Sequence, residues 1–78
     1  MPVAHRRYRV ANVKIIVNDQ PRPIEEGTTV AGLLQQLGLA GKHVAVEVNR
    51  QLVPRQQHHQ HALADGDQLE IVTLVGGG

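Results

Sequence analysis

The sequence predicts an α+β domain in which one main helix packs on one face of a mixed sheet of four to five strands. Three observations predict this class. Apolar residues alternate in several segments, one segment repeats its apolar residues at helical spacing, and clusters of turn-forming residues divide the segments. A chain of 78 residues has room for a single domain.

The first two predicted elements are strands. Residues 13–19 (VKIIVND) are rich in β-branched residues and end in turn formers, which is typical of a strand. Alternation places Ile15 and Val17 on one face of this strand and Ile16 on the other. Residues 20–26 (QPRPIEE) predict a short second strand, whose two prolines cannot donate to a ladder and therefore favour an edge position.

The hydrophobic period becomes helical between residues 26 and 42. An apolar stripe at i, i+3, i+4 and i+7 consists of Val30, Leu33, Leu34 and Leu37. We expect a helix of about ten residues, from Thr29 to Leu37. Thr28 or Thr29 can cap its start, and Gly38 suits the left-handed position after its last turn.

Strand periodicity returns after the helix. Residues 43–55 (HVAVEVNRQLVPR) predict a third strand, a two-residue turn and a short fourth strand at 51–53. Residues 55–63 (RQQHHQHAL) are polar and predict about one helical turn, with Leu63 as an apolar anchor. An Asp-Gly-Asp turn then leads into the last predicted strand, residues 68–75 (QLEIVTLV).

The predicted order of elements is therefore β-β-α-β-β-β. A long helix-containing stretch separates two hairpins, so the final strand can pair parallel to the first in the middle of the sheet. This is the β-grasp arrangement. It divides the chain into a basic N-terminal extension at 1–12, predicted to be disordered, a β-grasp domain at 13–75 and a flexible glycine tail at 76–78.

Four segments together resemble a known family. They are KIIVND, EEGTTVAGLLQQLGL, VAVEVNRQLVPR and ALADGDQLEIVTLVGGG. In this order and spacing they resemble the ubiquitin-like sulfur carrier proteins of thiamine biosynthesis, over residues 13–78. The two hairpin turns depart from the Asn-Gly pair usual in that family, since they read Asn18-Asp19 and Asn49-Arg50. Positive φ disfavours arginine by roughly 1 kcal/mol or more, so the turn type stays open.

The resemblance implies a role for the C-terminal residue. An E1-like adenylyltransferase would use ATP to adenylate the carboxylate of Gly78. A sulfur relay from a cysteine desulfurase would convert it to a thiocarboxylate, and thiazole synthase would take up the sulfur. The protein would bind no cofactor and no metal, and it would be a co-substrate rather than an enzyme. The alternatives are the small subunit of molybdopterin synthase, a ubiquitin-like protein modifier, or a plain interaction module.

Two further sets of residues serve the expected transfer. Gly76 and Gly77 have no Cβ, so they can thread a narrow partner site, and three extended residues reach about 10 Å. Ile16, Val72 and Leu74 are predicted to form an apolar patch that docks the partner, because their strands are neighbours and they share the face away from the helix. The competing interpretation is that they are ordinary exposed aliphatic residues.

Other charged and polar groups have simpler explanations. The sequence HHQH, with His58, His59 and His61, invites a metal site, but a polar solvated turn is favoured because no cysteine or evident carboxylate partner is close by in the sequence. The carboxylate pairs at 25–26 and 65–67 are explained by turn chemistry, with docking to arginines of a partner as the alternative.

Composition excludes several classes. The chain has no cysteine, so no disulfide or thiolate site can form, and its apolar content of 41% excludes a disordered chain. No stretch approaches the roughly 20 apolar residues that span a bilayer. The three arginines in residues 1–12 are too few to indicate nucleic-acid or membrane binding. A soluble, cytoplasmic protein is expected.

Overall fold

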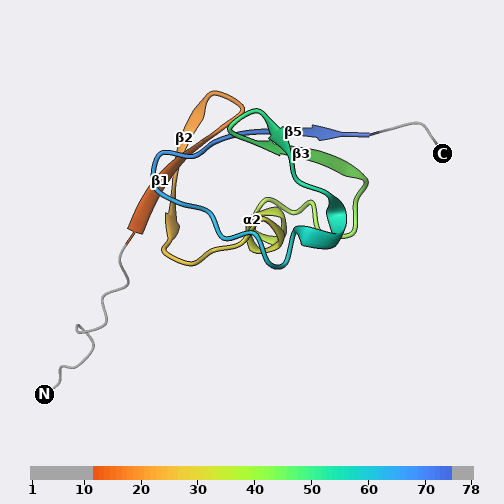
Figure 1. Ribbon diagram of the computed structural model, residues 1–78, viewed down its shortest axis with the longest axis horizontal. Helices are drawn as coiled ribbons and strands as arrows, with labels where there is room; N and C mark the ends of the chain where they lie inside the picture. The colour runs from red at the N-terminus through yellow and green to blue at the C-terminus, as the bar shows by residue number, and fades with distance from the viewer. Residues whose placement is uncertain (1–11, 75–78) are drawn as a thin grey trace, which may run out of the picture.

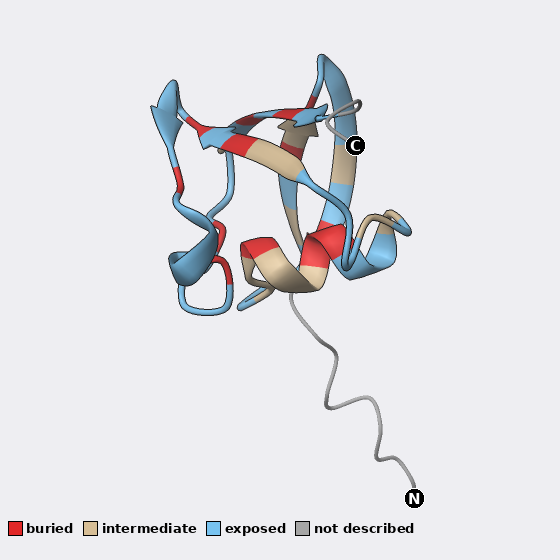
Figure 2. Ribbon diagram, turned by 90° about the vertical axis from the view of Figure 1, so that its right-hand side faces the viewer, coloured by how far each residue is buried: buried red, intermediate tan, exposed pale blue. Residues whose placement is uncertain are grey.

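The computed structural model describes residues 12–74, which form a five-stranded sheet with one helix across one of its faces (Figures 1 and 2). Its elements are β1 (Asn12–Val17), β2 (Gln20–Glu25), α2 (Val30–Gln36), β3 (Val44–Val48), β4 (Gln51–Leu52), the 3-10 helix η1 (Arg55–Gln57) and β5 (Gln68–Thr73). The expected α+β class and β-grasp arrangement are confirmed. The extension was predicted to include residue 12, but Asn12 is the first residue of β1. The rest of the extension and the tail at 76–78 lie outside the described residues.

The strands follow the order β2-β1-β5-β3-β4 across the sheet. The central pair β1 and β5 is parallel, and the other three pairs are antiparallel. Figure 1 shows β5 running through the middle of the sheet toward the C-terminal end of the chain. The predicted central parallel pair is therefore confirmed. No helix within residues 12–74 is long and apolar enough to cross a membrane.

The prolines explain why β2 lies at an edge. Pro21 pairs with Ile16, and Pro23 pairs with Lys14. Because the two prolines are two residues apart, both face the same side of the strand, and neither has an N–H to donate. The outer edge of β2 therefore lacks a backbone N–H donor at both prolines. Because a neighbouring strand would need these donors, this edge is suited to contact with solvent. The predicted edge position is confirmed.

Helix α2 has seven residues, fewer than the sequence predicts. Thr29 lies outside the helix as its N-cap, with extended backbone angles, and its Oγ1 accepts a hydrogen bond from the backbone N–H of Gly32 at 3.1 Å. Leu37 is the C-cap, and Gly38 follows with φ 76°. The apolar stripe therefore extends beyond the helical hydrogen bonds, because Leu37 and Leu39 pack against the core from the following loop.

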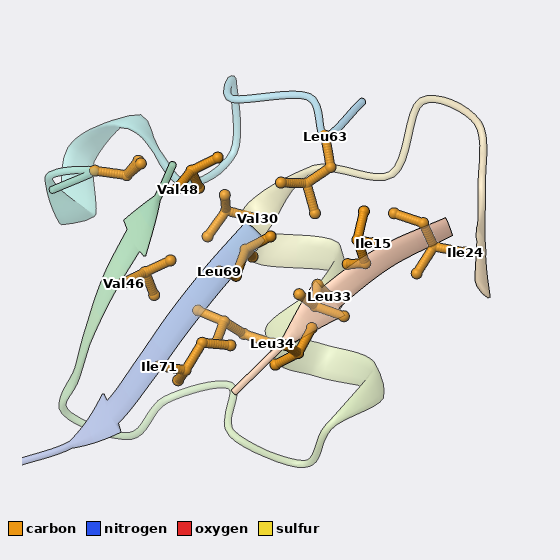
Figure 3. Packing of buried hydrophobic residues seen from close by; sticks show 12 residues of the cluster. Ile15, Ile24, Val30, Leu33, Leu34, Val46, Val48, Leu63, Leu69 and Ile71 are labelled. Atoms are coloured by element: carbon orange, nitrogen blue, oxygen red, sulfur yellow. The ribbon is translucent and has the colours of Figure 1, made fainter. Parts of the chain in front are cut away.

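The core lies between α2 and the sheet and is wholly aliphatic. Figure 3 shows side chains of the helix and of β1, β3 and β5 meeting in this space. The buried residues are Ile15, Val17, Ile24, Val30, Leu33, Leu34, Val46, Val48, Val53, Leu63, Leu69 and Ile71. Strands β1, β3 and β5 contribute alternate residues, as the sequence pattern predicts, whereas β2 contributes only Ile24 and both residues of β4 are exposed. Leu63 is the expected anchor of the loop before β5.

Both hairpin turns use the left-handed region. Two residues separate the paired residues Val17 and Gln20, and again Val48 and Gln51. The central residues have φ values of 50° and 68° in the first turn and 52° and 71° in the second. Positive φ at both central positions is the signature of a type I′ turn, so the turn type that the sequence left open is decided. Arg50 occupies a position at which the family more often has glycine.

Replacing Arg50 with glycine should therefore stabilise the protein. Left-handed geometry costs a non-glycine residue roughly 1–2 kcal/mol, and the greater freedom of unfolded glycine cancels part of the gain. We expect Arg50→Gly to raise the free energy of unfolding by about 0.5–1 kcal/mol, measured by urea denaturation.

The matched control is Arg55→Gly, since Arg55 in η1 is not among the residues with positive φ. This variant should lose about 0.5–1 kcal/mol, because glycine gains nothing there and is more flexible when unfolded. A loss of stability in Arg50→Gly would show that strain at Arg50 is not the dominant effect.

Candidate functional site

The described chain ends as it leaves the central strand β5. Leu74 is the last described residue, and its backbone N–H donates to the carbonyl oxygen of His43 at 2.8 Å. The described chain is thus held to the sheet as far as Leu74. The predicted site residues Gly76, Gly77 and Gly78 lie outside the described residues, and their role stays a prediction.

Asn18 secures β5 beyond the end of β1. Strand β1 stops at Val17, and the backbone N–H of Asn18 donates to Leu69 O at 2.9 Å. The Asn18 side chain then takes the place of the next residue of the strand: its Nδ2 donates to Ile71 O at 3.0 Å, and its Oδ1 accepts from Ile71 N at 2.8 Å. One amide side chain therefore continues the parallel ladder. The sequence pattern indicated only a turn-forming role for Asn18.

The Asp-Gly-Asp turn holds the start of β5. Asp67 accepts hydrogen bonds from Ala64 N at 2.8 Å and from Asn49 Nδ2 at 2.9 Å, and Asn49 Oδ1 accepts from Gln68 N at 3.0 Å. Asp65 Oδ1 accepts from Lys14 N at 2.7 Å. Both aspartates are thus acceptors in a network that joins β1, the start of β5 and the turn after β3. The predicted turn chemistry describes this pair better than a docking role does.

The strand register places one of the three predicted docking residues, Ile16, away from the other two. Ile16 lies beside Gln68 at the start of β5, whereas Val72 lies four residues further along β5, opposite Ala45 of β3. At about 3.3 Å per residue the offset is about 13 Å. Val72 and Leu74 share a face, but the structure does not bring Ile16 beside them. The expected single patch is wrong in this respect, because neighbouring strands need not align their apolar residues.

One exposed apolar residue was not singled out from the sequence. Val72, Leu74 and Leu52 are the large apolar residues that stay exposed within residues 12–74, with exposed fractions of 54%, 55% and 64%. Leu52 on β4 lies opposite Glu47 of β3 and so on the outer face. Its neighbour Val53 is buried, and this alternation was the signal available in the sequence.

Two glutamates face each other between the apolar positions. Glu47 of β3 and Glu70 of β5 are directly paired in the antiparallel register, and both are exposed. A hollow of about 490 Å³ on this side of the sheet is lined by both glutamates together with Ile16, Asp19, Asn49, Arg50, Gln68 and Leu69. Along β5, the outer face therefore changes from the hollow at Gln68 and Glu70 to the exposed Val72 and Leu74. Sequence alternation alone could not reveal this pairing.

The histidine segment differs from the expected solvated turn. His58 is 7% exposed, and its Nε2 lies 3.0 Å from the carbonyl oxygen of Val53. The backbone carbonyls of His58 and His61 accept hydrogen bonds from Ala31 N and Val30 N, both at 2.9 Å. The segment therefore caps the start of α2, where backbone N–H groups would otherwise lack partners.

His59 is exposed and His61 is half-buried. Within the part of the chain that the structure describes, no group of three or more histidine or carboxylate side chains is placed to hold a metal ion.

These features define a class of protein. A single helix on a mixed sheet, a parallel central strand pair and a chain end that leaves from the centre define a β-grasp protein of the ubiquitin-like class. The chain belongs to the ThiS family, which matches residues 15–78. The expected resemblance is therefore confirmed.

Individual relatives agree with this placement. The chain is 39% identical over 66 residues to the sulfur carrier protein ThiS of Escherichia coli, and it covers that protein completely. A crystal structure of the thiamine biosynthesis protein ThiS from Geobacter metallireducens matches 85% of the chain, with a TM-score of 0.72 and 30% identity.

Two similar proteins are much longer than this chain. A thiazole synthase of Paramagnetospirillum magneticum is 42% identical over 66 residues, and one of Magnetococcus marinus is 44% identical over 66 residues. The chain spans 20% of the length of each.

Removing the Asn18 side chain should loosen β5. Asn18→Gly keeps the left-handed backbone, since φ is 50°, and deletes both hydrogen bonds to Ile71. We expect a loss of about 1–3 kcal/mol in the free energy of unfolding, together with faster hydrogen exchange at the Ile71 amide. Urea denaturation and amide exchange measured by NMR would test this.

The control is Asp19→Gly in the same turn, where φ is 68°. Among the described residues, the side-chain hydrogen bonds to β5 in this turn come from Asn18 and not from Asp19. Asp19→Gly should therefore retain wild-type protection at Ile71. Equal effects of the two substitutions would contradict the proposed role of the Asn18 amide.

Proposed function

We propose that this protein carries sulfur for thiazole formation in thiamine biosynthesis, with the carbonyl carbon of Gly78 as the reactive centre. The observation that carries the proposal is the family match, which extends through the last residue and so includes the tail. The E. coli relative, which the chain covers completely, is itself named a sulfur carrier protein.

The proposed chemistry begins with a poor electrophile. A terminal carboxylate has a pKa of about 3.3–3.7 and is anionic at neutral pH. Its oxygen attacks the α-phosphate of ATP, pyrophosphate leaves, and an acyl-adenylate forms. Sulfide then attacks the carbonyl carbon and AMP leaves, which gives the thiocarboxylate. A persulfide donor instead gives an acyl disulfide, and a thiol reductant must then cleave its S–S bond.

In this proposal the tail enters the active site of the partner and the folded domain binds the surface of the partner. Glycines at 76–78 can enter a narrow tunnel in backbone conformations closed to other residues. Ordering them costs about 1–2 kcal/mol per residue, which contacts made by the folded domain must offset. Val72 and Leu74 are exposed beside the base of the tail and suit this docking role. Ile16 would contribute at a separate point, on the far side of Glu70.

The proposed partners are an E1-like adenylyltransferase, a cysteine desulfurase relay and thiazole synthase. The last of these has the most direct support, because two relatives that contain a matching segment are themselves named thiazole synthase. ATP would be used by the adenylyltransferase and not bound by this protein alone. We further propose a cytoplasmic location, where ATP is supplied to the adenylyltransferase.

Pull-down with the candidate partners separates the two carrier pathways. Retention of thiazole synthase by the tagged full-length protein would support the proposal. Retention of the large molybdopterin synthase subunit instead would overturn the thiamine assignment. Covalent conjugates of higher mass on a denaturing gel would favour a protein modifier.

Deleting Gly78 should abolish sulfur loading without loss of stability. The folded core lies within the described domain, so the melting temperature should stay within about 2 °C of the wild type. Intact-mass measurement after incubation with ATP, a sulfur donor and the adenylyltransferase should show the exchange of one oxygen for one sulfur only in the wild type. Reactions without ATP serve as the control, and loading of the shortened chain would refute the role of Gly78.

A further inference from the structure

We propose that the outer face of the sheet binds a cationic side chain of thiazole synthase between Glu47 and Glu70. This inference rests on the proposed function and specifies how the domain docks while its tail is held. Three observations support it: a pair of like charges without an evident structural use, a hollow beside the pair, and exposed apolar residues on both sides.

The like-charge pair is unfavourable for the isolated domain. Directly opposed residues in an antiparallel pair have their Cβ atoms about 4.5–5.5 Å apart, where two carboxylates repel each other. The aspartates of the nearby turn accept hydrogen bonds from Lys14 N, Ala64 N and Asn49 Nδ2. Among the hydrogen bonds of residues 12–74, none is accepted by the Glu47 or Glu70 carboxylate. An external cation would relieve their repulsion.

The hollow makes room for such a cation. Its volume is about 490 Å³, and it carries three carboxylates, from Asp19, Glu47 and Glu70, against a single cationic residue, Arg50. The guanidinium group of arginine can bond two carboxylates through separate N–H groups, whereas a lysine ammonium offers a compact charge. The excess of negative charge therefore selects a basic partner surface.

Apolar residues frame the charged pair. Leu52 lies directly across from Glu47, and Val72 follows Glu70 on the same face of β5. Exposed apolar groups around a charge exclude water on docking and so strengthen the ionic contact. The arrangement is continuous with the base of the tail, because Leu74 continues this face of β5. A partner that holds the tail therefore reaches the glutamate pair as well.

Thiazole synthase is the proposed source of the cation because some proteins of that name contain a segment similar to this domain. Two proteins named thiazole synthase contain a segment 42% and 44% identical to this chain over 66 residues. A domain joined to the enzyme in one polypeptide is held near it, which favours a defined contact between the two. The present chain spans 20% of the length of those proteins, and we infer the same contact for the outer face of its own sheet.

The test compares two full-length double variants that each remove two negative charges. E47Q/E70Q deletes the opposed pair, and E25Q/E26Q deletes two exposed glutamates at the end of β2. Affinity for purified thiazole synthase from the same organism is measured by isothermal titration calorimetry. We expect E47Q/E70Q to bind about tenfold more weakly and E25Q/E26Q to bind like the wild type. The melting temperature of E47Q/E70Q should equal or exceed that of the wild type, because repulsion is removed.

This combination of effects distinguishes docking from a structural role, since a structural contact would lose stability together with affinity. Wild-type affinity should also fall more steeply with salt than that of E47Q/E70Q. Equal affinities of the two double variants would overturn the inference. A loss of affinity confined to the adenylyltransferase would also overturn it, because the cation would then belong to a different enzyme.

The arginines at 6, 7 and 9 are a second source of cations within the chain itself. Introducing E47Q/E70Q into an R6Q/R7Q/R9Q background tests them. The tenfold loss should persist there, and its disappearance would mean that the glutamates act through the arm. Failure of the proposed function is recognised separately, since sulfur loading of the wild-type chain is measured by mass and does not depend on the glutamate pair.

Discussion

The pairing of β5 with β1 in the centre of the sheet is the constraint on which the rest of the structure depends. Parallel neighbours need a long crossover, and here the connection from β1 to β5 contains β2, α2, β3, β4 and η1. The pairing itself is short, because β1 ends at Val17. Asn18 extends it with two side-chain hydrogen bonds to Ile71. A chain end held between two strands can leave the domain from a rigid base.

This central position also gives β5 two different faces. Leu69 and Ile71 are buried against the helix side, whereas Glu70 and Val72 are exposed on the outer side. The inner face has the aliphatic composition that a small domain without disulfides requires for stability. The outer face combines exposed apolar groups with the opposed carboxylates of Glu47 and Glu70, which accept no hydrogen bond among those found within residues 12–74. Features that conflict with local stability tend to occur where a protein meets its partners.

The similar proteins relate the folded body and the tail to the proposed function. The family match covers both the folded body and the tail, at residues 15–78. The solved ThiS structure from Geobacter metallireducens shares the fold at 30% identity, which suggests that the body tolerates extensive change while its architecture is kept. Sulfur carriage would then require a body that docks and a terminus that reacts, with little chemistry in between.

The sequence by itself determined the elements, their order and the two faces of each strand. Hydrophobic period, turn residues and a threonine cap at residue 28 or 29 act over a few residues, so they can be identified without coordinates. Only the tertiary structure decided the offset of Ile16 from Val72, the opposition of Glu47 and Glu70, and the burial of the histidine segment against the start of α2. These features depend on strand register and on contacts between segments far apart in the chain, which no local pattern specifies.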